Sequence, residues 1–186
     1  MIVISGKYRG RRLYALEGDN TRPTTARMKE DMFNILNNYF IFDGKKSLDL
    51  FGGSGALSIE GLSRGIEHAY INDNSRYAMS VIKENLKGIH PSNFTLYEKD
   101  YSDLLDLFNI KDSKFDLFYL DPPFKEVEYY YNFFNKVVDY NLANNWAIVI
   151  VESEKALDLE QIKEFKLLKH KEYKTKNMYF FRLERG

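Results

Sequence analysis

Hydrophobic residues recur along the chain with two alternating periods. Helical spacing predicts three helices, at 75–88, 101–108 and 127–141, and a fourth that begins at Ala56. Short apolar runs predict the strands that alternate with them, at 47–51, 68–72, 94–99, 115–120 and 146–151. Strands that alternate with helices are typical of parallel βαβ units with right-handed crossovers. The central part of the chain is therefore predicted to form an α/β sheet.

The two ends of the chain depart from this alternation. Residues 2–5 and 11–16 predict two short strands around a turn at Gly6–Gly10, and a helix capped by Thr24 or Thr25 follows them. Residues 165–174 and 178–185 have no helix between them, so they predict an antiparallel pair at one edge of a mixed sheet. We expect an N-terminal hairpin and helix over 1–40 and a main domain over 41–186.

Composition places the chain among globular proteins and excludes several kinds of site. Hydrophobic residues make up 44% of the 186 residues, enough to bury a core. The absence of cysteine excludes a disulfide framework, a thiolate metal site and a cysteine nucleophile, and the three histidines have no metal-ligand spacing. The longest apolar run, at 146–151, is too short for a membrane span. We expect a cytoplasmic protein without a metal, and a monomer or a weak dimer.

Charge is distributed unevenly although the formal net charge is zero. Residues 1–30 carry seven Lys or Arg against three acids, 31–159 carry twelve against twenty, and 160–186 carry eight against four. The sequence "GKYRGRR" holds four cations and no acid, and a basic edge of this kind can bind a polyanion in a neutral protein. The residues expected to grip a nucleic-acid backbone are Lys7, Tyr8, Arg9, Arg11 and Arg12.

A glycine-rich loop separates the strand at 47–51 from the next helix. In "LDLFGGSGALSIE", glycines allow a sharp turn and a close approach of the backbone to a ligand, and the new helix presents free N–H groups. The third glycine of a dinucleotide fingerprint is replaced by Ser58. A turn without a ligand is the alternative. The candidate cofactor-binding residues of this loop are Asp49, Phe51, Gly52, Gly53, Ser54 and Gly55.

Two further strand ends carry polar residues suited to a nucleoside. Asp73 lies 20 residues after Gly53, where a carboxylate can hold a ribose, and Asn72 beside it could reach the same hydroxyls. Asp100 and Tyr101 follow the strand at 94–99 and could bracket a base, although Asp also caps helices routinely.

The strand at 115–120 ends in the motif "DPPF", residues 121–124. Asp121 and the carbonyl of Pro122 are acceptors, Pro123 stiffens the turn, and Phe124 offers a stacking ring. Together they would form a receptor for a flat heterocycle with an exocyclic amine, whereas in isolation the motif could be a plain turn. Because ligands of open α/β sheets bind beyond the carboxyl ends of strands, we expect all these clusters to face one crevice.

These motifs resemble those of a known family. The glycine loop is similar to the first motif of class I S-adenosylmethionine-dependent methyltransferases, and "DPPF" resembles their amine-methylating motif. With "SGKYRGRRL" and "RPTTARMKEDMFNIL", the whole chain resembles the RsmD family, which methylates N2 of a guanine in 16S ribosomal RNA. The resemblance implies a Rossmann-like fold with a seven-stranded, mostly parallel sheet and an antiparallel C-terminal strand. It also implies S-adenosylmethionine as cofactor and 16S rRNA or the assembling small subunit as partner.

The resemblance leaves some roles open. The family commonly has a glutamate where this chain has Asn72, so either Asn72 or Asp73 would meet the ribose. Arg22 and Arg27 flank "PTTA" and could meet the cofactor carboxylate or an RNA phosphate, or could be plain solvated residues. Asp121 could accept hydrogen bonds from the amine or also remove its proton.

Three other functions remain open at this point. "DPPF" also suits a DNA methyltransferase acting on adenine N6 or cytosine N4, although the chain is short for a sequence-specific DNA enzyme. A nicotinamide-dependent oxidoreductase would use a similar fold, but the missing third glycine and "DPPF" argue against it. A catalytically silent RNA-binding module would lack cofactor affinity.

Overall fold

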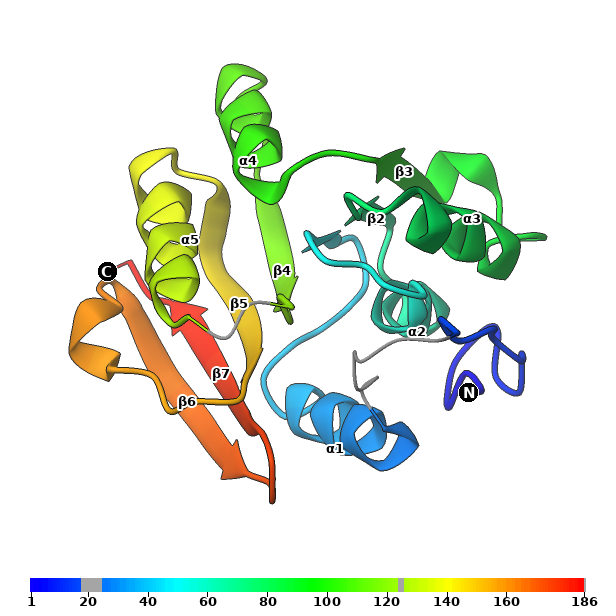
Figure 1. Ribbon diagram of the computed structural model, residues 1–186, viewed down its shortest axis with the longest axis horizontal. Coiled ribbons are helices and arrows are strands. Elements are labelled where there is room, and N and C mark those ends of the chain that lie inside the picture. Colours follow the sequence, from blue (N-terminus) through cyan, green and yellow to red (C-terminus); the bar gives the residue numbers. More distant parts are fainter. Residues whose placement is uncertain (18–24, 124–125, 186) are drawn as a thin grey trace. The chain divides into compact units, whose positions relative to one another are not determined.

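A computed structural model describes residues 1–17, 25–123 and 126–185 (Figure 1). Two of the expected site residues, Arg22 and Phe124, lie outside the described residues. The chain forms two compact units, Met1–Lys99 and Asp100–Gly186. The functional division expected at residue 40 stays a prediction.

The first unit contains three parallel strands in the order β3-β2-β1. In β1 and β2, Leu48 pairs with Tyr70, and in β2 and β3, Ile71 pairs with Leu96. Because these strands are parallel, their carboxyl ends lie at one edge of the unit's sheet. Its elements are α1 (Ala26–Leu36), β1 (Lys46–Asp49), α2 (Ala56–Arg64), β2 (His68–Asn72), α3 (Arg76–Asn85), the 3₁₀ turn η1 (Pro91–Asn93) and β3 (Phe94–Tyr97).

The helices of this unit begin at the expected caps and end earlier than expected. The side chain of Thr25 accepts a hydrogen bond from Met28 N at 3.1 Å, and that of Ser75 accepts one from Ala78 N at 3.2 Å. Helix α3 ends at Asn85 rather than at Gly88, because the last residues tighten into turns with i to i+3 hydrogen bonds.

The second unit contains four strands in the order β4-β5-β7-β6. Strands β4 and β5 are parallel, while β7 is antiparallel to both β5 and β6, which confirms the predicted antiparallel C-terminal edge. Its elements are α4 (Tyr101–Ile110), β4 (Phe115–Leu120), α5 (Glu128–Asp139), β5 (Ala143–Ser153), the 3₁₀ turn η2 (Leu159–Gln161), β6 (Phe165–Glu172) and β7 (Asn177–Leu183).

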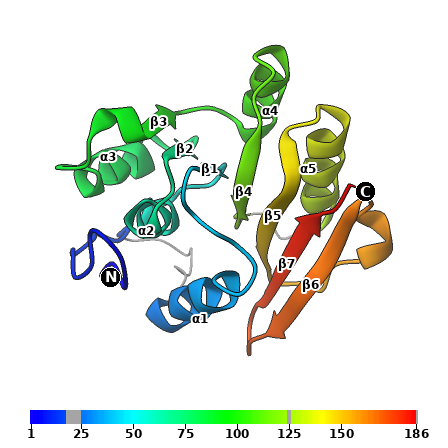
Figure 2. The same ribbon diagram turned by 180° about the vertical axis from the view of Figure 1, so that it is seen from behind.

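Helix α5 covers one face of this sheet, as the two opposite views show (Figures 1 and 2). The ring of Phe134 lies 5.2 Å, centroid to centroid, from those of Phe165 on β6 and Phe181 on β7. On the same helix, the ring of Phe133 lies 5.8 Å from that of Phe118 on β4. Edge-on aromatic packing of this kind anchors α5 across three strands.

The N-terminal segment differs from the prediction of two regular strands. Within 1–17 the two arms form one antiparallel bridge, between Ile2 and Arg12, with backbone hydrogen bonds from Val3 N to the Arg11 carbonyl at 2.9 Å and from Leu13 N to the Met1 carbonyl at 2.8 Å. The backbone N–H groups of Ile4 and Ser5 donate to the carboxylate of Glu60 on α2, at 2.9 and 3.2 Å. The hairpin is therefore shorter than predicted, and its tip is fastened to α2.

Candidate functional site

The glycine-rich loop leaves β1 and turns into α2. Gly53 and Gly55 have φ angles of +59° and +81°, in the left-handed region that favours glycine. The carboxylate of Asp49 accepts a hydrogen bond from Phe51 N at 3.1 Å, as expected for an acid that organises loop amides. Gly52 N donates to the carbonyl of Asn72 at 2.7 Å, which joins the loop to the end of β2.

Asp73 contacts this loop directly. Its Oδ2 accepts a hydrogen bond from Gly53 N at 2.9 Å, and its Oδ1 accepts one from Ser75 N, also at 2.9 Å. Each carboxylate oxygen keeps a second lone pair, and the side chain is half-buried. An added Cβ at Gly53 would find no atom closer than Leu16 Cδ1 at 4.0 Å, so the backbone is open there. An open backbone beside a strand-end carboxylate fits the ribose and backbone requirements of a nucleoside cofactor.

Asn72 has a different environment from Asp73. It is 1% exposed, and its Nδ2 donates to the carbonyls of Leu50 and Lys99, both at 2.9 Å, while its Oδ1 accepts from Lys99 N at 3.0 Å. Both amide hydrogens are therefore committed to the backbone. The side chain fastens the segments that follow β1 and β3. A contact between Asn72 and a ribose hydroxyl stays a prediction, and only Oδ1 could make it.

Asp100 and Tyr101 open α4 in the second unit. The Oδ1 of Asp100 accepts from Ser102 N at 2.9 Å and from Asp103 N at 3.2 Å, so this residue is a helix cap. Tyr101 is half-buried, and burial, with the nearby Asp100 carboxylate, raises the pKa of its hydroxyl. Their contact with a base stays a prediction, as does the single crevice, which would involve both units.

Asp121 follows the last residue of β4, at the carboxyl end expected for it. The ring of Pro122 is buried and Pro123 is exposed. Lys176, in the turn between β6 and β7, places its Nζ 3.8 Å from Asp121 Oδ1 and 3.3 Å from Glu152 Oε2. No local pattern pointed to Lys176 or Glu152, because their contact depends on how the β6–β7 turn folds near the end of β5.

A buried carboxylate fastens the basic N-terminal segment. Glu60 and Lys29 are both 0% exposed, and Glu60 Oε1 lies 3.2 Å from Lys29 Nζ while its Oε2 accepts from Arg64 Nε at 2.9 Å. Lys29 also donates to the carbonyl of Ile2 at 2.9 Å. Together with the bonds from Ile4 and Ser5, these contacts hold the segment against α2.

The expected RNA-binding residues differ in exposure. Lys7, Arg9 and Arg12 are exposed, and Tyr8 is half-buried under the Lys7 ammonium, 5.5 Å from its ring. Arg11 is half-buried because its guanidinium donates to the carbonyls of Asn85 and Lys87 at the end of α3. Arg11 thus fastens the N-terminal segment to the end of α3.

Arg27 lies exposed on α1. Its contact with the cofactor carboxylate or with an RNA phosphate stays a prediction.

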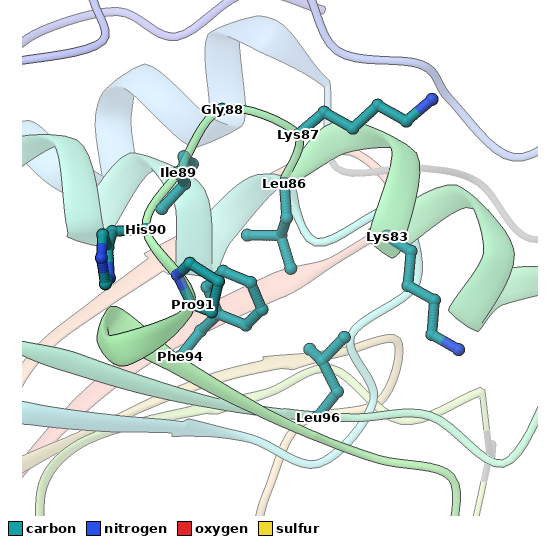
Figure 3. A pocket seen from close by; sticks show the side chains of 9 residues that line it. All are labelled: Lys83, Leu86, Lys87, Gly88, Ile89, His90, Pro91, Phe94 and Leu96. Carbon is teal, nitrogen blue, oxygen red and sulfur yellow. The ribbon is translucent and has the colours of Figure 1, made fainter.

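A hollow of about 530 Å³ lies in the first unit at and beyond the end of α3 (Figure 3). Apolar side chains line it, and those of Lys83 and Lys87 extend away from the lining. The lining residues are Lys83, Leu86, Lys87, Gly88, Ile89, His90, Pro91, Phe94 and Leu96.

No cluster of three or more His, Asp or Glu residues in the described part of the chain could hold a metal ion. No described helix is both long and apolar enough to cross a membrane.

Comparisons with known proteins agree with the motifs. The family model described as conserved hypothetical protein 95 matches residues 1–182. Ribosomal RNA small subunit methyltransferase D of Haemophilus influenzae is 32% identical over 174 residues, which cover 91% of this chain and 86% of the relative. YlbH of Bacillus subtilis, to which an rRNA methyltransferase activity is ascribed, is 36% identical over 162 residues, covering 87% and 86%.

A solved structure supports the same grouping. Escherichia coli yhhF, to which a methyltransferase activity is ascribed, superposes with a TM-score of 0.86 at 26% identity, covering 100% of this chain and 99% of that one. This likeness confirms the predicted Rossmann-like class I methyltransferase fold.

Proposed function

Since this chain belongs to the family described as conserved hypothetical protein 95, the RsmD family of rRNA methyltransferases, we propose that it methylates the exocyclic N2 amine of one guanine in 16S rRNA. The observation that carries the choice of an amine is Asp121, followed by Pro122 and Pro123, at the carboxyl end of β4. The class of enzyme rests on the family, and the target atom and base are the proposal.

The glycine loop and Asp73 would hold the cofactor. S-adenosylmethionine brings an already reactive methyl group on a sulfonium, so the chain's own residues have to position the amine rather than create an electrophile. The open backbone at Gly53 and the carboxylate of Asp73 beside it suit the nucleoside part of that cofactor. Asp100 and Tyr101 are the candidates for its base.

Asp121 and the Pro122 carbonyl would receive the guanine amine. Two acceptors for its two N–H bonds would orient the nitrogen lone pair and stabilise the positive charge that develops as the N–C bond forms. Phe124 would stack on the base, and the base must first leave its own stack, at a cost of a few kcal/mol. Pro122 and Pro123 limit the backbone at this point, which keeps the acceptors in place.

The N-terminal segment would contact RNA phosphates through Lys7, Arg9 and Arg12, which are exposed. Reversing these charges should weaken RNA binding and flatten its dependence on salt. The substrate would be 16S rRNA or an assembling small subunit in the cytoplasm of a bacterium.

Methyl transfer from labelled cofactor tests the proposal. The protein is incubated with 16S rRNA, with small subunits from cells that lack it, and with naked DNA, and the products are digested to nucleosides for mass spectrometry. N2-methylguanosine from one of the two RNA substrates is expected. Methylated adenine or cytosine from DNA would refute the proposal.

A matched pair of variants tests the assignment of Asp121. Asp121→Ala should lower transfer by roughly a hundredfold or more, the order seen when a transition-state hydrogen-bonding group is removed, and leave cofactor affinity unchanged in calorimetry. Asp116→Ala makes the same change at the amino end of β4, where Asp116 accepts from Asn144 Nδ2 at 2.9 Å, and should be nearly silent for transfer. Equal activity of the two variants would contradict the role given to Asp121.

A further inference from the structure

Three charged side chains from three parts of the second unit, Asp121, Glu152 and Lys176, meet at the carboxyl end of β4. Lys176 lies in the turn between β6 and β7, and Glu152 lies on β5. The Lys176 ammonium is 3.8 Å from Asp121 Oδ1 and 3.3 Å from Glu152 Oε2. The side chains of Lys176, Glu152 and Asp121 are 14%, 1% and 30% exposed.

The Lys176 ammonium thus contacts two carboxylates that differ in burial, Glu152 being buried and Asp121 partly exposed. Two carboxylates that share one ammonium repel each other, and the cation between them offsets that repulsion. With Lys176 charged and both acids ionised, the cluster carries one net negative charge. That remaining charge can stabilise a positive nitrogen beside Asp121.

Lys176 is charged at neutral pH. Burial disfavours its ammonium form, but the charges of Asp121 and Glu152 outweigh burial and raise its pKa above the ordinary value. Among the described residues, Tyr130 on α5 and the exposed Glu154 after β5 also act on this cluster. Burial, together with the nearby acids, raises the pKa of Tyr130, and its neutral hydroxyl donates to the Glu152 carbonyl at 2.8 Å.

We propose that Lys176 is a positioning residue for methyl transfer, which keeps Asp121 ionised as a hydrogen-bond acceptor and makes it too weak a base to remove the proton of the amine. This inference rests on the proposed function. In the step, the guanine nitrogen bonds to the methyl carbon while the carbon–sulfur electrons stay on sulfur, which leaves as a neutral thioether. The nitrogen then loses a proton to solvent water, and Asp121 remains a carboxylate throughout.

The pH dependence of kcat/KM separates this role from a structural one. In Lys176→Met the pKa of Asp121 should rise, because the variant loses a cation that favours the ionised carboxyl at this distance. The acidic limb of the pH profile should therefore move to higher pH. Lys176→Arg keeps the positive charge, so its acidic limb should lie at the wild-type pH.

A matched control lies in the same turn. Lys174→Met removes an exposed cation two residues away and should give a profile that overlays the wild-type one. In the double variant of Lys176→Met with Glu152→Gln, the acidic limb should return toward the wild-type position, because the negative charge of Glu152 is removed together with the cation. This double variant leaves no unpaired charge on Glu152, so its folding shows whether a loss of activity in Lys176→Met comes from unfolding.

The pKa of the Asp121 carboxyl, measured by ¹³C NMR in wild type and variants, gives a readout that needs no turnover. A pKa that is the same in wild type and Lys176→Met overturns the inference, even where transfer to RNA is normal. A wild-type protein that methylates no RNA refutes the proposed function instead, whatever the NMR titration shows. A raised pKa with a shifted acidic limb supports both.

Discussion

The buried carboxylate of Glu60 offers the sharpest test of how the first unit is held together. Four donors point at it: the N–H groups of Ile4 and Ser5, the ammonium of Lys29 and Nε of Arg64. Each carboxylate oxygen receives one backbone N–H and one cation. In Glu60→Gln, whichever way the amide is turned, an NH₂ group faces two donors and Lys29 loses its counter-ion.

We expect Glu60→Gln to lower the free energy of unfolding of the first unit by about 3 kcal/mol. Breaking a buried ion pair by removing one partner costs about 3–5 kcal/mol, and Arg64, at the edge of the cluster, can turn toward water and recover part of it. Urea unfolding followed by circular dichroism measures the change. Glu67→Gln, the same substitution at an exposed acid in this unit, should change stability by less than about 0.5 kcal/mol.

A double-mutant cycle with Lys29→Met completes the test. Once Glu60 is neutral, removing the Lys29 charge should cost much less than in the wild type, with a coupling of about 1–3 kcal/mol. Strict additivity, or a loss below about 1 kcal/mol in Glu60→Gln, would refute this account of the cluster.

The direction of the Glu60 pKa shift predicts how the stability of the first unit changes in acid. Burial opposes ionisation, but the hydrogen bond from Ile4 and the contacts with Arg64 and Lys29 outweigh it, so the pKa lies below its ordinary value of 4.5. The folded state therefore binds fewer protons than the unfolded state as pH falls below 4.5, and stability is lost until the folded pKa is passed. Glu60→Gln should show a weaker loss in this window.

Two glycine pairs give further predictions. A Cβ at Gly6 would lie 1.9 Å from the carbonyl oxygen of Ser63, whereas one at Gly10 would meet nothing within 4 Å, although both residues have positive φ. Gly6→Ala should therefore undock the N-terminal segment and lower RNA affinity, while Gly10→Ala should cost only about 1–2 kcal/mol of backbone strain; equal melting temperatures would contradict this. In the glycine loop, a Cβ at Gly52 would lie 2.8 Å from Ile71 Cγ2, whereas one at Gly53 would meet nothing closer than 4.0 Å, so Gly53→Ala should cost only the backbone strain of its positive φ, about 1–2 kcal/mol. A loss of cofactor affinity in a folded Gly53→Ala variant would then report direct contact with the ligand, and unchanged affinity would count against it.

The elements that could be predicted from the sequence are those with a strong local pattern. The strands over 68–72 and 115–120 have the predicted limits, because continuous apolar runs bounded by polar residues leave little freedom. The caps Thr25 and Ser75 were also predictable, since a cap acts within three residues of itself.

The contacts that could not be predicted join residues far apart in the chain. Glu60 sits on a helix where an acid is ordinarily solvated, and its burial depends on a segment more than fifty residues upstream. Lys176 lies between the two predicted C-terminal strands, where no motif singles it out, and only the fold of the β6–β7 turn brings it to Asp121. Asn72 was predicted as a ligand by its place in the chain, and the structure adds a backbone-fastening role that no local pattern showed.

The docking of the N-terminal segment also sets an order of events during synthesis. Its hydrogen bonds to Glu60 and Ser63 span 55 to 58 residues, and those between Tyr14 and Asn85 span 71. At about 5–20 residues per second, the most basic stretch of the nascent chain has no partner helix for several seconds after it leaves the ribosome. The segment proposed to bind ribosomal RNA is thus made before the surface that shapes it, and it becomes ordered only when α2 and α3 have followed.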